Sequence, residues 1–391
     1  MEFEPWMLLV FPLFFGMGWL AARMDIKQLV DESSALPRSY FQGLNFLLNE
    51  QQDKAIDAFI EVVKVDPQTV ELHFALGSLF RRRGEIDRAL RMHLNLVERA
   101  DLEPEKQQQA LFELAQDYLK AGILDRAEDA FRQLLESSYA RHAMEFLLEL
   151  YQKEKDWRKA IEMAHKLETV SGAPQTRLIG FFYCEMAEEA LKKDESVAAR
   201  EHLNAALEAD PNNARASILL GDIELTAGKT SQAVACWEYI EKQDAQYLPL
   251  VAERILSAYR QLEQADEGVN RLREWQEHYP SLDMMNVLFD AILQRSGKDA
   301  AYTLVRDELR RHPTLLGLDK LLEARLLEVE ESRRADIEMV RELIRQRTRT
   351  LSMYRCKQCG FKARQFYWHC PACHGWETYP PRRSEENGLQ I

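Results

Sequence analysis

The fold is decided by residues 43–55, Gly-Leu-Asn-Phe-Leu-Leu-Asn-Glu-Gln-Gln-Asp-Lys-Ala, and residues 76–89, Leu-Gly-Ser-Leu-Phe-Arg-Arg-Arg-Gly-Glu-Ile-Asp-Arg-Ala. Small residues recur in these stretches at a spacing of 34: Gly43 and Gly77, Ala55 and Ala89. A small residue on each of two antiparallel helices lets the helices pack closely, and larger side chains fill the groove to the next pair. The stretches therefore predict a repeated helical hairpin.

The same frame continues along the chain. It recurs after an insertion at Ala115 and Ala127, and again at the 34-residue pairs Ala187/Gly221 and Ala199/Ala233. This period resembles the tetratricopeptide repeat (TPR), with about eight to nine copies over residues 37–349. We therefore expect an all-α superhelical solenoid.

A TPR solenoid binds other proteins through the inner face of the first helix of each pair. Most aromatic and alanine positions in the frame are core positions. Non-consensus residues on the inner face are the candidates for contacting a partner: Phe74, Ser78, Arg81, Gln116 and Lys120.

The N-terminus carries an uncharged run, Trp6 to Ala22, of seventeen residues. Such a run is just long enough to span a bilayer. Acidic residues precede it and basic residues follow it, so the positive-inside rule places the rest of the chain in the cytoplasm. A cleaved signal peptide, which needs a positive start, and a buried core helix are the alternatives. We expect a single-pass anchor.

Composition and motifs argue against an enzyme. The chain has 391 residues, 46% of them hydrophobic, with only 16 Gly and 13 Pro, which excludes a disordered or loop-rich all-β protein. Gly228-Lys229-Thr230 resembles the end of a phosphate-binding loop, but position 223 is Ile where that loop needs Gly. We therefore predict a binding protein without catalysis of its own.

Four of the six cysteines fall within 18 residues near the C-terminus, as C-x2-C-x10-C-x2-C. Two such pairs can each aim two thiolates at one ion and complete a closed tetrahedral site. The candidate ligands are Cys356, Cys359, Cys370 and Cys373. Paired disulfides are the alternative, and they are disfavoured in a cytoplasmic protein.

The motif leaves two metals open. Four sulfur ligands suit zinc or iron. Tyr-x-Cys-x-x-Cys-Gly-Phe and Cys-Pro-x-Cys resemble the rubredoxin knuckles, which implies iron, whereas the short gap and His374 in place of glycine depart from rubredoxin. His369 and His374 flank ligands, and we expect neither to bind the metal.

A basic run lies between the array and the cysteines. Its members are Arg341, Arg345, Arg347, Arg349, Arg355, Lys357, Lys362 and Arg364. It could dock on acidic lipid or an acidic partner, bind nucleic acid through a zinc ribbon, or offset the charge of the metal–thiolate centre and of a chain with net charge −13. We favour the charge offset and expect no nucleic-acid binding.

The whole chain resembles the bacterial lipopolysaccharide assembly protein B family. The resemblance rests on residues 43–55, 76–89, 125–129, 354–361 and 367–373. It implies an adapter at the cytoplasmic face of the inner membrane that modulates lipopolysaccharide synthesis. Implied partners are a membrane AAA metalloprotease, the lipid A-pathway deacetylase that it degrades, and inner-membrane lipopolysaccharide sensor and assembly proteins. It also implies that the four cysteines carry the metal and that the metal module packs on the array.

These interpretations divide the chain into five parts. We expect an anchor at 1–23, a juxtamembrane linker at 24–36, the array at 37–349, a rubredoxin-type metal domain at 350–381 and a flexible tail at 382–391. Self-association is left open. The alternative function is a rubredoxin-like electron-transfer protein on a TPR scaffold.

Overall fold

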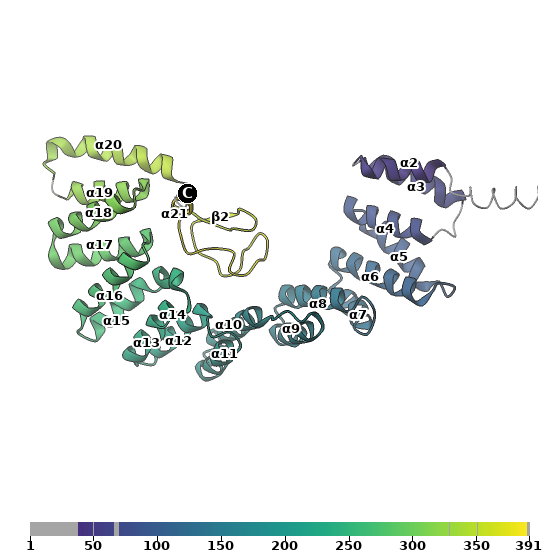
Figure 1. Cartoon of the computed structure of the whole chain (residues 1–391), viewed down its shortest axis with the longest axis horizontal. Helices are drawn as coiled ribbons and strands as arrows, with labels where there is room; N and C mark the ends of the chain where they lie inside the picture. The colour runs from purple at the N-terminus through teal and green to yellow at the C-terminus, as the bar shows by residue number, and fades with distance from the viewer. Residues whose placement is uncertain (1–37, 50, 66–69, 328, 350, 389–391) are drawn as a thin grey trace, which may run out of the picture. The chain divides into compact units, whose positions relative to one another are not determined.

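The computed structural model describes residues 38–49, 51–65, 70–327, 329–349 and 351–388 (Figure 1). The described chain is mostly helical, as the repeat frame predicts. Its helices in the array are α2 (Arg38–Leu48), α3 (Gln52–Val65), α4 (Val70–Arg83), α5 (Ile86–Glu98), α6 (Pro104–Ala121), α7 (Leu124–Gln133), α8 (Ala140–Glu154), α9 (Trp157–Ser171), α10 (Thr176–Lys192), α11 (Ser196–Ala209), α12 (Ala214–Thr226), α13 (Thr230–Glu238), α14 (Ile240–Asp244), the 3₁₀ helix η2 (Ala245–Leu250), α15 (Ala252–Gln261), α16 (Ala265–His278), α17 (Leu282–Ser296), α18 (Lys298–Arg311), α19 (Leu315–Leu326) and α20 (Glu331–Thr348).

The described chain forms two compact units. The first runs to Asp156 and includes Thr169–Ser171, and the second comprises Trp157–Glu168 and the chain from Gly172 onward. In the first unit each helix from α2 to α8 packs on the next, and α4 also packs on α6. This order is the helical hairpin stacking that a TPR array requires.

The 34-residue frame corresponds to one packing motif in both units. Gly77 on α4 lies against the ring of His93 on α5, and a Cβ at position 77 would overlap that ring. In the second unit Gly221 on α12 faces Trp237 on α13 in the same way. Each ring lies 16 positions after its glycine. The glycines of the frame are therefore sites of close helix approach.

The turn between α12 and α13 explains the Gly-Lys-Thr tripeptide. Gly228 adopts φ 76, a left-handed conformation that favours glycine, and its N–H bonds to the carbonyl of Leu225. Thr230 then begins α13. The tripeptide is a helix–helix turn of the array, as its sequence position predicts.

The second unit ends in a small module. Strands β1 (Tyr354–Arg355) and β2 (Lys362–Ala363) pair antiparallel, with Tyr354 opposite Ala363. Both cysteine pairs lie in loops, the first between β1 and β2 and the second between β2 and α21 (Ser384–Gly388). In Figure 1 the module lies beside the helices of the second unit, close to the C-terminal end of α20.

The C-terminal residues differ from the sequence interpretation. Within residues 382–388, which we expected in a flexible tail, Ser384–Gly388 form α21, and Arg383, Glu385 and Glu386 bond to the array. The difference has a physical reason. These polar side chains bond to groups at the starts of α17 and α19, which are distant in sequence, so no local sequence pattern reveals the contacts.

The expected anchor lies outside the described residues. Across the part of the chain that the structure describes, none of the helices has both the length and the hydropathy of a membrane span.

Candidate metal centre

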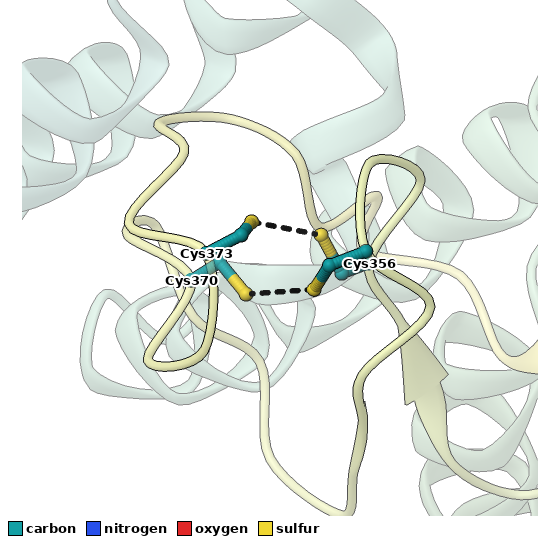
Figure 2. Close-up of side chains that lie close together, drawn as sticks. Cys356, Cys370 and Cys373 are labelled. Atoms are coloured by element: carbon teal, nitrogen blue, oxygen red, sulfur yellow. Dashed lines mark hydrogen bonds between the residues drawn. The ribbon is translucent and has the colours of Figure 1, made fainter. Parts of the chain in front are cut away.

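The four cysteines of the motif meet at one point of the module. Their sulfur atoms all lie within 4.8 Å of one another. The Sγ atoms of Cys356 and Cys373 are 3.7 Å apart, and so are those of Cys359 and Cys370; dashed lines mark both contacts in Figure 2, where Cys356, Cys370 and Cys373 are labelled. Zinc–sulfur bonds of about 2.3 Å in a tetrahedron give sulfur–sulfur edges of about 3.8 Å. The sulfur atoms therefore fit a single tetrahedral ion.

The same distances argue against the disulfide alternative. A disulfide brings two sulfur atoms to about 2.05 Å, whereas these pairs are separated by 3.7 Å and all six cysteines are free. Cys184 is fully buried inside α10, and Cys236 is partly buried on α13. Both lie in the helical core, as expected.

The two halves of the site have the same backbone geometry. In each, the first cysteine donates its N–H to the carbonyl five residues on and accepts from the N–H four residues on. These bonds measure 2.9 and 3.0 Å at Cys356 and 2.9 Å each at Cys370. The residue four positions on is left-handed in both halves, Gly360 at φ 77 and His374 at φ 56. His374 therefore occupies a glycine position of the second knuckle.

Hydrogen bonds favour the thiolate form of one ligand. The pKa of Cys356 is lowered to about 6: burial opposes ionisation, but bonds from the Thr378 side chain and the backbone N–H groups of Cys359 and Gln358 outweigh it. A thiolate is the form that binds a metal ion. The hydrogen bonds to Cys356 therefore favour the form of this side chain that can coordinate a metal ion.

The two flanking histidines have other partners. The Nε2 atom of His369 donates to the carbonyl of His374 at 2.9 Å, and the His369 ring stacks on Trp376 at 4.4 Å. Neither histidine belongs to the metal-ligating group formed by the cysteines. These contacts of His369 agree with a role in holding the loop next to the metal ligands rather than in binding the metal.

The module is held on the array by aromatic packing. Phe181 on α10 stacks on Trp376 at 5.2 Å and lies 6.1 Å from Trp368. Tyr247 on η2 lies 4.8 Å from Trp368 and 6.3 Å from Phe366. Aromatic pairs at such distances add to the energy of burial.

Polar contacts accompany this packing. Glu377 pairs with Arg177 on α10 and accepts a hydrogen bond from the Tyr247 hydroxyl at 3.3 Å. Burial raises the pKa of Glu377, although Arg177 opposes the shift. The carboxylate is thus a partly desolvated contact whose partners both come from the array.

Sequence reasoning did not identify these docking residues. A signal was present: residues 366–368 read Phe-Tyr-Trp and Trp376 follows within ten residues. A module of this size cannot bury so many large rings within itself, so some must pack on another surface.

The groove candidates divide into two groups. Phe74 is 7% exposed and packs with Leu96 and Ala110. Arg81 on α4 bonds to Asp117 at 2.9 Å and to Glu113 at 2.5 Å, both on α6. Both side chains therefore make contacts that hold α4, α5 and α6 together, and their role as partner contacts stays a prediction. Ser78 and Gln116 are half-buried and Lys120 is exposed.

Part of the basic run is paired with the array. Arg341 bonds to Asp319 at 2.9 Å and also to Glu323, and Arg345 bonds to Asp319 at 3.2 Å. These contacts join α20 to α19. The positive charges of these two arginines are therefore compensated by acidic side chains of α19, which agrees with the expected charge offset.

Profiles of two known protein families match parts of the chain. The profile of a family described as "Rubredoxin metal binding domain" matches residues 354–381, and that of the tetratricopeptide repeat matches residues 42–101 and 184–246. Among solved structures, the match with a tetratricopeptide repeat protein from Parabacteroides merdae covers 74% of this chain and 100% of that protein, at 14% identity and a TM-score of 0.34.

The curated relatives are far more similar. "Lipopolysaccharide assembly protein B" of Escherichia coli K12 is 38% identical over 380 residues, covering 96% of this chain and 98% of the relative. The protein of the same name from Haemophilus influenzae is 31% identical, covering 97% of this chain and 99% of the relative. On this similarity the chain belongs to the lipopolysaccharide assembly protein B family.

Proposed function

We propose that this protein is a non-catalytic adapter in lipopolysaccharide assembly, tethered to the cytoplasmic side of the bacterial inner membrane. The names of its relatives support the pathway, and the TPR array supports protein binding. The tether rests on the sequence of residues 1–23, followed by a linker at 24–36.

One observation supports the adapter role: the array of the second unit binds a polypeptide segment, the metal module of the same chain. It binds the metal module through stacked rings on α10 and η2 and through the Arg177–Glu377 pair. A surface that combines aromatic anchors with an arginine paired to a partly buried carboxylate has the composition of a protein-binding site.

The first unit offers a second candidate surface, which is polar. Ser78 on α4 and Gln116 and Lys120 on α6 lie on neighbouring helices and keep solvent exposure. Arg81 fixes these two helices relative to each other by bonding to Glu113 and Asp117. We assign this surface to partner recognition, with Arg81 as a positioning residue.

The proposed partners are those that the family resemblance implies. The adapter brings the lipid A-pathway deacetylase to a membrane AAA metalloprotease and receives a signal from an inner-membrane lipopolysaccharide sensor. Tethering supports this role because confinement to one membrane raises the effective concentration of each partner.

The metal has a structural role in this proposal. Four protein ligands close the coordination sphere of one iron or zinc ion, so the ion stabilises the module and leaves no position for a substrate. The exposure of Cys359 favours the second candidate function, electron transfer, because an exposed ligand edge shortens the path to a redox partner.

The half-life of the deacetylase in growing cells tests the adapter role. Gln116→Arg combined with Lys120→Glu places a bulky cation and an inverted charge on the α6 surface, and we expect the deacetylase to persist several-fold longer. Gln133→Arg, at an exposed position of α7, is the matched control and should leave the half-life unchanged. An unchanged half-life in the α6 variant would contradict the proposed surface.

Metal replacement distinguishes the second candidate. A chain loaded only with zinc cannot transfer electrons but keeps a folded module. Full activity of the zinc form in deacetylase turnover would rule out electron transfer as the function.

A further inference from the structure

We propose that residues 382–388 are a latch that fixes the position of the metal module on the array, and that this latch acts independently of the metal ion. The matched rubredoxin-type domain ends at residue 381, and the four cysteines all precede it. The latch therefore lies outside the metal-binding motif in sequence. Its contacts are to the array and to the start of the module.

Arg383 is the centre of the latch. Its Nη2 and Nε atoms bond to Asp283 on α17 at 2.8 and 2.9 Å, and its Nη1 donates to the carbonyl of Ser352 at 2.7 Å. The guanidinium also lies 4.1 Å from the ring centroid of Tyr354, whose hydroxyl donates to the same Asp283 at 2.6 Å. One carboxylate of the array, Asp283, thus binds both the start of the module at Tyr354 and the latch at Arg383.

Two glutamates of α21 bind the first N–H groups of two array helices. Glu385 accepts from Leu315 at 2.5 Å and from Leu316 at 3.0 Å, at the start of α19. Glu386 accepts from Leu282 at 2.9 Å, at the start of α17. The first N–H groups of a helix have no partner within the helix, and the helix dipole favours a carboxylate there.

The start of α17 needs this partner. Ser281 stands at its N-cap position but makes no side-chain capping bond, and its buried Oγ atom has no partner among the described residues. Thr314, at the same position of α19, does cap its helix by accepting from Gly317 at 3.0 Å. Glu386 therefore supplies α17 with a cap that its own sequence does not provide.

The module is consequently held by two separate sets of contacts. Its aromatic residues pack on α10 and η2, and the latch binds α17 and α19. The cysteines organise the interior of the module, where Cys356 and Cys370 are buried with Tyr354 and Tyr379. Metal binding and docking should therefore be separable by mutation.

Two latch variants of the full metal-loaded chain test this separation: a chain ending at Pro381, and Glu385→Gln combined with Glu386→Gln. We expect a protease to cleave residues 350–381 about tenfold faster or more, because charge-assisted contacts to the array are lost. The ratio of metal to chain should stay at the parent value. Glu253→Gln with Glu277→Gln removes two exposed carboxylates of the same array and is the matched control.

Each outcome decides the proposal. Cleavage as slow as in the parent chain would show that the latch does not fix the module. Loss of the metal in the latch variants would show that residues 382–388 belong to the metal-binding fold, and would also overturn it. Asp283→Asn, which leaves the C-terminus intact, should accelerate cleavage in the same way, with helical content by circular dichroism confirming a folded array.

None of these measurements requires a partner protein. A failed latch test therefore leaves the adapter proposal standing, and a failed deacetylase test leaves the latch standing.

Discussion

Gly221→Ala tests the packing on which the repeat frame depends. An added Cβ would overlap the Trp237 ring, which is fully buried and fixed by a 3.1 Å hydrogen bond from its Nε1 atom to the carbonyl of Ile218. Overpacking of this kind costs about 1–3 kcal/mol, whereas alanine is the better helix former by about 1 kcal/mol. Since the ring cannot move without losing its hydrogen bond and its packing, we expect the upper part of that range and a net loss of about 1–2 kcal/mol.

Thermal unfolding followed by circular dichroism measures this loss. For a unit of this size about 1 kcal/mol lowers the midpoint by about 2–4 °C. Thr226→Ala, at the exposed end of the same helix, is the control and should shift the midpoint little.

A double-mutant cycle identifies the cause. Trp237→Leu removes the ring, so Gly221→Ala should cost much less in that background, with a coupling energy of about 1 kcal/mol or more. Equal costs in both backgrounds would refute the close approach of α12 and α13 as the reason for glycine. A stabilising Gly221→Ala in the parent chain would refute it as well.

The other predictions concern the metal site, a buried charge and the anchor. Cys370→Ser should abolish metal binding and raise proteolysis of residues 354–381 while helical content stays high, as metal analysis and circular dichroism will show. Asp117→Ala removes the carboxylate shared by His93 and Arg81 and should cost about 3–5 kcal/mol in urea unfolding, whereas the exposed Asp125→Ala should cost less than about 0.5 kcal/mol. Deletion of residues 1–22 should leave a folded, soluble chain that fails to lower deacetylase levels at native expression; full activity of that chain would contradict the tether.

Most of the fold could be predicted because the repeat frame encodes it locally. Gly77 and Gly221 recur in register, and each faces a ring 16 positions later in the structure. The cysteine motif was equally informative, since its spacing alone implied one four-sulfur group, and the sulfur atoms do lie within 4.8 Å of one another.

The partners in the polar docking contacts could not be predicted, for a physical reason. Arg177 and Glu377 are 200 residues apart in sequence, and Asp283 and Arg383 are 100 apart. Long-range pairs of this kind leave no periodicity, because each side chain looks locally like any surface charge. For the same reason no local pattern predicts that Arg81 bonds to Glu113 and Asp117, which lie 32 and 36 positions further along the chain.

An adapter role requires the inner surface of the array to recognise a partner protein. Photo-crosslinking in living cells from a probe at position 116, on the surface of α6, tests it most directly, with a probe at position 133 on α7 as the control. We expect position 116 to capture the lipid A-pathway deacetylase or the membrane protease and position 133 to capture neither. The same captured proteins from both positions, or neither of these two from position 116, would contradict it.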